Sequence, residues 1–180
     1  MVPNSPAVNR ILETSLYVEE LNRSITFYTR VFGFAVLFRD HRMCAMAVPD
    51  RQVLLLFFKG GSILPTETRA GIIPPHDSRG TQHLCFSIPD SALYIWQDHL
   101  KLLGIALESR LDWPRGGSSL YFRDPDDHSI EVATSGLWQN GPRAAASEDV
   151  TDRDYDDQAN GDRDRFPSRR PPDAGEFNGD

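Results

Sequence analysis

The sequence of 180 residues predicts an α+β fold that is built from two copies of one βαβββ unit. A strand-like segment at 13–18 has a counterpart at 83–88, seventy positions later. Each segment is followed by an amphipathic helix that ends at a glycine, Gly33 or Gly104, so the offset is kept within one residue. Three further strand-like runs follow each helix. Two such units in tandem predict a cupped, partly open mixed sheet with the helices outside.

The first unit is expected at residues 11–60. Its helix has apolar residues at helical spacing, at Leu21, Ile25, Tyr28 and Phe32. Gly33 is suited to end this helix, because glycine adopts the left-handed conformation at little cost. Three strand-like runs complete the unit, at 35–38, 44–48 and 53–58.

The second unit is expected at residues 81–139, after a connecting loop at 61–80. Asp90 is a good N-cap for its helix. The helix has apolar residues at Leu93, Trp96, Leu100 and Leu103. Its three later strands are predicted at 105–108, 119–123 and 130–133.

The two ends of the chain differ in composition from the body. Residues 1–10 are predicted to be a flexible N-terminus, and residues 140–180 a disordered acidic tail. Residues 147–180 contain 11 acidic residues and five arginines, whereas residues 1–146 contain 15 acidic and 14 basic residues. The nearly neutral body lacks the concentrated basic face that nucleic acid requires, so we expect no nucleic-acid partner.

The apolar runs and the cysteines indicate the compartment. The N-terminal residues do not resemble a signal peptide, and no apolar run approaches the roughly 20 residues that span a bilayer. Cys44 and Cys85 both lie in apolar segments and are expected to be free thiols. We therefore expect a soluble, cytoplasmic protein with no membrane partner.

Strand alternation places apolar residues on one face of each strand and small or polar residues on the other. The polar faces include Glu13, His83, Tyr121 and Glu131. Two interpretations stay open: these faces point to water, as in many antiparallel sheets, or they line a hollow. A carboxylate in a hollow must be protonated, paired or bound to a metal, and Glu13, His83 and Glu131 together would meet that need.

Two motifs resemble the vicinal oxygen chelate superfamily, which includes glyoxalase I, extradiol dioxygenases, fosfomycin-resistance transferases and bleomycin-resistance proteins. Residues 21–34, LNRSITFYTRVFGF, resemble its first helix. Residues 119–131, SLYFRDPDDHSIE, resemble its C-terminal metal-ligand hairpin. The resemblance covers about residues 11–134 and implies a tandem βαβββ fold.

The resemblance also implies one divalent metal ion held by Glu13, His83 and Glu131. It implies that Tyr121 is catalytic, with its phenol donating a hydrogen bond to a substrate oxygen on the metal. Glu13 stands where the family most often has histidine. A dication with two carboxylates is formally neutral, so the harder ions Mn²⁺ and Fe²⁺ are favoured, while Zn²⁺ and Mg²⁺ stay open.

By resemblance, the chain is a metal-dependent enzyme acting on a small organic molecule chelated through vicinal oxygens, with dioxygenase-like or lyase-like chemistry. The strand at 53–58 is wholly apolar and lacks the fourth ligand of glyoxalase I. Its Leu55 and Phe57 are expected to bind an apolar substrate body. Ser119 is a further substrate-binding candidate. The alternative function is metal-free binding or sequestration of a small molecule, of the bleomycin-resistance type.

Several other polar residues have two interpretations. Arg115, before two glycines, either grips an anionic substrate group or belongs to a plain hairpin turn. His76 is either a surface residue or an acid or base on a lid. His128 is expected to be structural and His99 to face solvent. Cys85 would need electropositive surroundings to be reactive.

A homodimer is expected, because a second copy commonly covers the exposed edges of such sheets. The partner also affects the metal site. Glu13 joins His83 and Glu131 either of its own chain or of that second copy, and the sequence leaves both arrangements open.

Overall fold

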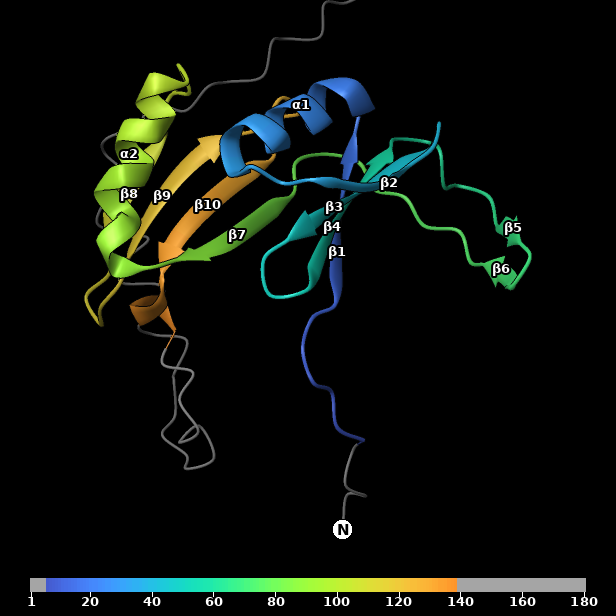
Figure 1. Ribbon diagram of the computed structural model, residues 1–180, viewed down its shortest axis with the longest axis horizontal. Coiled ribbons are helices and arrows are strands. Elements are labelled where there is room, and N and C mark those ends of the chain that lie inside the picture. The colour runs from blue at the N-terminus through green and yellow to red at the C-terminus, as the bar shows by residue number, and fades with distance from the viewer. Residues whose placement is uncertain (1–5, 139–180) are drawn as a thin grey trace, which may run out of the picture. The chain divides into compact units, whose positions relative to one another are not determined.

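The computed structural model describes residues 6–138, which form two similar four-stranded sheets and two long helices (Figure 1). Module 1 contains β1 (Glu13–Val18), α1 (Leu21–Phe32), β2 (Val36–Arg39), β3 (Met43–Val48) and β4 (Gln52–Phe58). Module 2 contains β7 (His83–Ile88), α2 (Leu93–Leu102), β8 (Ser109–Asp112), β9 (Ser118–Arg123) and β10 (Ser129–Thr134). The expected acidic tail at 140–180 lies outside the described residues.

The strand order is the same in both modules, which confirms the internal repeat. One sheet has the order β1-β4-β3-β2 and the other the order β7-β10-β9-β8. In each sheet the first strand pairs parallel to the last strand of its module, and the remaining pairs are antiparallel. The predicted α+β class with mixed sheets is therefore confirmed. The two sheets are not joined by a strand pair.

Three local predictions were wrong. Residues 105–108 do not form the strand, which lies instead at β8; Ile105 and Leu107 pack against the core from the segment between α2 and β8. Asp90 does not cap α2: it opens a 3-10 turn, Asp90–Ala92, and α2 starts at Leu93 without a side-chain cap. The connecting segment is not all loop, since it contains a small hairpin of β5 (Thr66–Thr68) and β6 (Gly71–Ile73).

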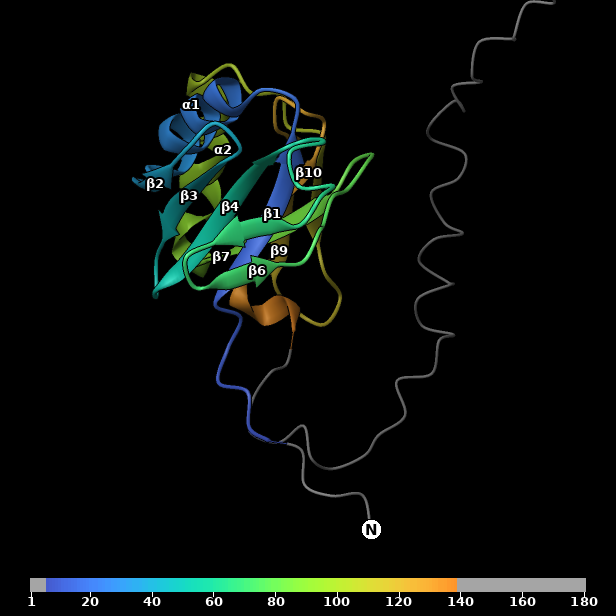
Figure 2. The same ribbon diagram turned by 90° about the vertical axis from the view of Figure 1, so that its right-hand side faces the viewer.

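The core lies between the helices and one face of each sheet, and both helices are on the same side of the strands (Figure 2). Alternation along the strands predicted these apolar faces correctly. The fully buried strand residues include Leu16, Leu54, Leu56, Leu120, Phe122, Ile130 and Val132. Phe32 at the end of α1 joins the two modules, because its ring packs against Phe86 and Trp96 at 4.6 and 5.2 Å between centroids.

The turn between β9 and β10 binds the start of α1 in the other module. Asp126 Oδ1 accepts hydrogen bonds from the backbone N–H of Glu19 at 2.8 Å and from Arg23 Nη2 at 3.0 Å. Its Oδ2 accepts one from Ser24 Oγ at 3.0 Å. Glu20, the N-cap residue of α1, makes no side-chain cap bond. Asp126, about a hundred residues later in the sequence, instead places a carboxylate at the N-terminus of α1, where negative charge is stabilising.

Two more residues of this turn complete the joint. The buried Asp124 accepts hydrogen bonds from Tyr28 Oη and from the backbone N–H of His128, each at 2.9 Å. Burial raises the pKa of Asp124. His128 is completely buried: its Nδ1 accepts from the N–H of Gln82 and its Nε2 donates to the carbonyl of Tyr17, both at 2.9 Å. His128 is thus a buried structural histidine, as predicted.

None of the helices in the described part of the chain has the length and apolar character needed to cross a membrane.

We expect Asp126→Ala to destabilise the protein by about 2–3 kcal/mol, because it removes three hydrogen-bond acceptor contacts at a carboxylate whose side chain is 0% exposed. Arg23→Ala is the matched control. It removes only the ion pair with Asp126, from a side chain that is 47% exposed, and should cost less than about 1 kcal/mol. Urea unfolding followed by tryptophan fluorescence measures both. Equal losses in the two variants would contradict the capping role.

Candidate functional site

His83 and Glu131 form a close pair on the polar face of the second sheet. They start from adjacent parallel strands, in which His83 is paired with Ser129 and Glu131 with Cys85. Residues 129 and 131 lie on the same face of β10, so the two side chains meet there. His83 Nε2 lies 3.3 Å from Glu131 Oε2. The carboxylate is almost fully buried, at 4% exposure, whereas the imidazole is 53% exposed.

The pair has the features of a partial metal site. His83 Nδ1 lies 3.1 Å from the carbonyl oxygen of Ser129, which accepts a hydrogen bond from Nδ1–H, and Nε2 faces the carboxylate of Glu131. Metal-binding histidines are commonly oriented by such a bond from the other ring nitrogen. Glu131 Oε1 is buried and has no hydrogen-bond partner among the described residues. An orphaned buried carboxylate oxygen is costly, and a bound cation would satisfy it.

Two further side chains share this face with Glu131. Tyr121 is the antiparallel partner of Glu131 on β9, and its ring stacks on that of His83 at 6.2 Å between centroids. Burial and the negative charge of Glu131 raise the pKa of Tyr121 to about 12. The same two causes raise the pKa of Cys85 to about 12. Both groups therefore stay protonated at neutral pH: Tyr121 can donate a hydrogen bond, and Cys85 is a poor nucleophile.

The third predicted ligand, Glu13, does not join this pair within the chain. It is exposed at the start of β1, on the other sheet, where it is paired with Val53. Within residues 6–138 no three His, Cys, Asp or Glu side chains are grouped closely enough to hold a metal ion. The structure thus brings together two of the three predicted ligands.

The predicted substrate-binding residues are also divided between the two modules. Leu55 and Phe57 lie on the same face of the first sheet as Glu13, since they are paired with Ser15 and Tyr17. Leu55 is half-buried and Phe57 is buried, at 5% exposure.

On the second sheet, Ser119 lies two residues before Tyr121 on the same face, and its hydroxyl accepts a hydrogen bond from Trp113 Nε1 at 2.8 Å. Arg115 is exposed in a hairpin turn, closed by the N–H of Gly116 donating to the Trp113 carbonyl and by the N–H of Trp113 donating to the Gly117 carbonyl. The segment is therefore a hairpin turn, and a role of Arg115 in binding an anionic substrate group stays a prediction.

Comparison with known proteins decides the family. Residues 10–132 match the model of the glyoxalase/bleomycin resistance protein/dioxygenase superfamily. The chain belongs to this superfamily. It is 29% identical to a catechol-2,3-dioxygenase of Bacillus subtilis over 125 residues, which cover 65% of this chain but only 38% of that enzyme. It is 27% identical to metallothiol transferase FosB of Shouchella clausii, covering 72% of this chain and 83% of the relative.

A solved structure gives the same assignment. The crystal structure of a lactoylglutathione lyase from Agrobacterium tumefaciens has a TM-score of 0.69 and 32% sequence identity to this chain. The similarity covers 74% of this chain and 99% of that one. The three similar proteins are named for three different reactions, so superfamily membership establishes the fold and leaves the reaction to the site residues.

The sequence did not predict one pair of side chains, His76 and Tyr17. The pair lies on the first sheet, which also carries Glu13. His76 is half-buried against the first sheet, and its Nδ1 lies 2.7 Å from Tyr17 Oη. Its ring meets Phe57 edge-on at 4.6 Å between centroids. Strand alternation placed Tyr17 on the polar face, but no local pattern indicates that a loop 59 residues later folds back onto it. The expectation for His99 was wrong: it bonds the Val31 carbonyl at 2.9 Å, because α1 ends against α2.

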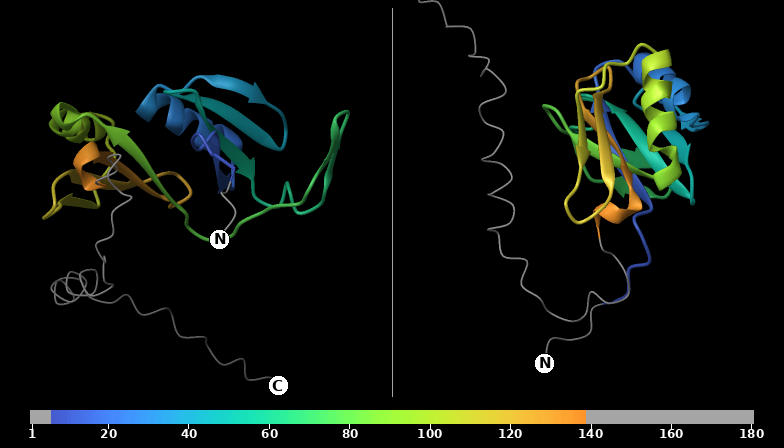
Figure 3. Two further views of the ribbon diagram at one scale, coloured as in Figure 1. Left: turned by 90° about the horizontal axis from the view of Figure 1, so that it is seen from below. Right: turned by 90° about the vertical axis from the view of Figure 1, so that its left-hand side faces the viewer.

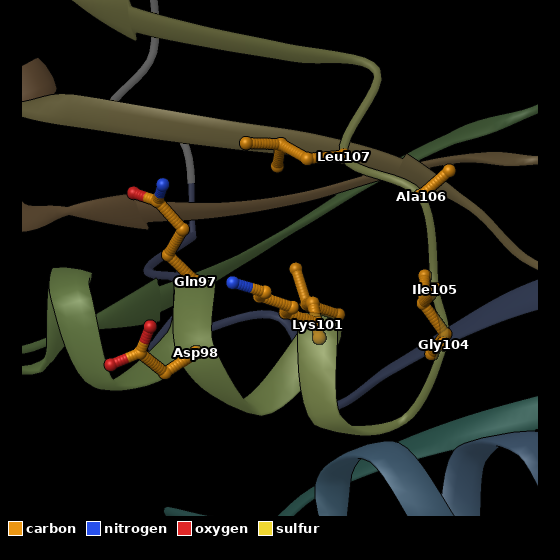
Figure 4. A pocket seen from close by; sticks show the side chains of 8 residues that line it. Gln97, Asp98, Lys101, Gly104, Ile105, Ala106 and Leu107 are labelled. Atoms are coloured by element: carbon orange, nitrogen blue, oxygen red, sulfur yellow. The ribbon is translucent and has the colours of Figure 1, made fainter.

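A hollow of about 430 Å³ lies beside α2, away from the predicted site (Figure 4). Its lining includes Gln97, Asp98, Lys101, Ile105 and Leu107. None of the predicted ligands or substrate-binding residues lines it. With one carboxylate and one ammonium group it offers no set of metal ligands.

In chelator-treated protein we expect Cys85 to react slowly with iodoacetamide at pH 8, although it is exposed, because its pKa of about 12 leaves little thiolate. Burial is the largest cause of this raised pKa and the charge of Glu131 the next. Glu131→Gln removes that charge, which should lower the pKa and accelerate alkylation about tenfold. Glu108→Gln is the control, since Glu108 is paired with Arg123 at 2.7 Å instead. Mass spectrometry of Cys85 measures the rates. Equal rates in wild type and Glu131→Gln would show that Glu131 does not control this thiol.

Proposed function

We propose that this chain is a metal-dependent enzyme of the superfamily, and that its site is shared between two copies. His83 and Glu131 of one chain and Glu13 of a second would hold one divalent ion. The observation that carries this proposal is the pair of His83 and Glu131. Its imidazole nitrogen lies 3.3 Å from a buried carboxylate, which has one oxygen without a hydrogen-bond partner among the described residues.

The exposed position of Glu13 supports the shared arrangement. β1 and β7 are edge strands of their sheets, and each contains a predicted ligand, Glu13 or His83. Gln82 and His128 of the same chain bond the backbone of Tyr17 near the end of β1, whereas Glu13 at its start is exposed. Open edges are commonly covered by a second copy, and twofold symmetry would bring Glu13 of each chain to the half-site of the other. Such a dimer would contain two equivalent sites.

The donor set also indicates the ion and its use. Two carboxylates and one imidazole form a formally neutral site with a dication, which favours Mn²⁺ or Fe²⁺ over softer or more strongly Lewis-acidic ions. When bound, a metal with open positions would polarise two adjacent oxygens of a small organic substrate. Tyr121, kept protonated by its surroundings, would donate a hydrogen bond to the charge that develops on a substrate oxygen.

The residues around the half-sites suggest the rest of the substrate. On the first sheet, Leu55 would contact the apolar part of the substrate. The more deeply buried Phe57 would pack beside Leu55. Ser119 would contact the substrate beside Tyr121, and Arg115 would attract an anionic group from the rim. Because the position paired with Glu13 is Val53, the first sheet offers no fourth ligand there. We therefore favour a dioxygenase-like or lyase-like reaction at a three-ligand site.

Protein purified without added metal should contain close to one Mn²⁺ or Fe²⁺ per chain, measured by mass spectrometry of the elements. Glu131→Gln, His83→Ala and Glu13→Gln should each reduce metal affinity at least about tenfold, because each removes one of three ligands. Glu108→Gln, outside the site, should keep wild-type metal content.

The contrary outcome is equally specific. Two results together would contradict the enzyme proposal. The purified wild type would contain no metal, and in the presence of Mn²⁺ the ligand variants would have the same melting temperature as the wild type. These results would favour the metal-free binding protein instead.

Two variants that each lack one metal ligand distinguish a site shared between two chains from a site within one chain. In a mixed dimer of Glu13→Ala and Glu131→Ala chains, one of the two sites would have all three ligands intact. With random mixing about half of the dimers are mixed, so metal binding should return to about one quarter of the wild-type sites. Co-expression with two different tags, followed by metal analysis of the mixture, measures this. No recovery would contradict the shared site.

A further inference from the structure

The segment that joins the two modules folds back onto the first sheet at His76. After β4 the chain runs out into the hairpin of β5 and β6, returns past module 1 and enters β7 (Figures 1 and 3). The N–H of His76 donates to the carbonyl of Ser62 at 2.8 Å, which ties the two ends of this excursion together. His76 Nδ1 lies 2.7 Å from Tyr17 Oη on β1. His76 is therefore held at the sheet both by its backbone and by its ring.

The ring of His76 is fixed by aromatic neighbours, and one of its nitrogens stays available. The ring meets Phe57 edge-on at 4.6 Å between centroids, and the Tyr17 ring stacks on Phe57 at 5.7 Å. Tyr17 and Phe57 are buried, whereas His76 is half-buried. Within residues 6–138, no hydrogen-bond partner lies at His76 Nε2. An imidazole that is bound through Nδ1 to a phenol, with Nε2 open, is oriented for one more hydrogen bond.

The charges around His76 favour an anionic partner for this nitrogen. The Arg42 guanidinium lies 5.4 Å from the centroid of the Phe57 ring and donates a hydrogen bond to Ser62 Oγ at 2.9 Å. Among the described residues it has no carboxylate partner. The carboxylate of Asp77, next to His76 in sequence, accepts a backbone N–H at 3.0 Å instead. A cation without an acidic partner, close to a half-buried imidazole, favours binding of an anion.

His76 lies at one end of the sheet face that carries Glu13. Along β1, side chains alternate, so Glu13, Ser15 and Tyr17 share this face. A rise of about 3.3 Å per residue puts Tyr17 roughly 13 Å from Glu13 along the strand. Between them, Ser15 is paired with Leu55, and both are half-buried. The face therefore has a carboxylate at one end, a mostly apolar middle and the imidazole of His76 at the other end.

We propose that His76 is a specificity-determining residue, whose Nε2–H donates a hydrogen bond to an anionic group at the far end of the substrate. Tyr17 is its positioning residue: the phenol donates to Nδ1, which places the ring proton on Nε2. A separation of roughly 13 Å along the strand is too long for His76 to act on oxygens chelated beside Glu13, so its role is recognition.

This assignment defines a substrate class. The substrate is an elongated molecule with vicinal oxygens at one end, an apolar middle over Leu55 and an anionic oxygen group, such as a carboxylate, at the other end. The inference rests on the proposed function, because the position of the vicinal oxygens comes from Glu13 and the metal site. It adds a second polar contact, which the metal chemistry itself does not require.

The test compares the binding of two catechol probes to the full chain loaded with Mn²⁺, by isothermal titration calorimetry in the absence of oxygen. 4-Pentylcatechol has vicinal oxygens and an apolar chain. 6-(3,4-Dihydroxyphenyl)hexanoate adds a carboxylate at the end of the same five-carbon chain. The wild type should bind the carboxylate probe at least about tenfold more tightly, because a hydrogen bond to a charged acceptor is of the stronger kind.

Three variants assign this preference to its residues. His76→Ala should bring the two dissociation constants within about twofold of each other, because the donor is lost. Tyr17→Phe removes only the hydroxyl and should reduce the preference to about threefold, since the His76 ring is no longer oriented. His76→Gln keeps a side-chain N–H donor and should retain part of the preference. His41→Ala, at an exposed histidine outside this cluster, is the control and should keep the full preference.

Circular dichroism and thermal melting establish that each variant is folded, and metal content is measured on the same samples. A preference for the carboxylate probe that is equal in the wild type, His76→Ala and Tyr17→Phe would overturn the inference. A wild type that binds both probes equally, or neither, would overturn it as well. Metal content that still depends on Glu131 in those samples would leave the proposed function intact, so the two proposals fail separately.

Discussion

The fold depends on carboxylates that one module supplies to the other. Asp126 caps α1 and Asp124 receives the phenol of Tyr28, so the turn between β9 and β10 holds the helix of module 1 at three points. The buried His128 of the same turn connects it to strand β1, through a hydrogen bond to the carbonyl of Tyr17. The two sheets share no strand pair, and these polar contacts and the ring of Phe32 are among the contacts that set their relation. The positions of the half-sites follow from it.

The hairpin of β9 and β10 has a structural role and, in the proposed function, a chemical one. Its turn binds α1, and its strands present Tyr121 and Glu131 on the opposite face. The polar face is built from small or protonated groups, which leaves the carboxylate of Glu131 with one unsatisfied oxygen. That oxygen is the strongest local sign of a ligand, since buried polar atoms without partners are uncommon and costly.

Strand alternation and the repeat predicted much of this architecture. The buried faces, the end of α1 at Gly33 and the meeting of His83 with Glu131 follow from spacing and family resemblance together. Helix α2 ends earlier than predicted, with Leu103 as its C-cap. The separation of Glu13 could not be predicted, because spacing along a strand does not say whether two sheets close around each other within one chain. Asp126 was likewise hidden: a helix cap is usually sought next to the helix, and this one comes from distant sequence.

Tyr17 shows how tightly the parts are interlocked. Its backbone N–H donates to the side chain of Gln82, its carbonyl accepts from His128, and its hydroxyl meets His76. One residue of an edge strand thus connects β1, the hairpin of β9 and β10, and the segment that joins the modules. The register of β1 cannot slide without breaking all three contacts at once, so the protein fixes where its first carboxylate stands before any ligand arrives.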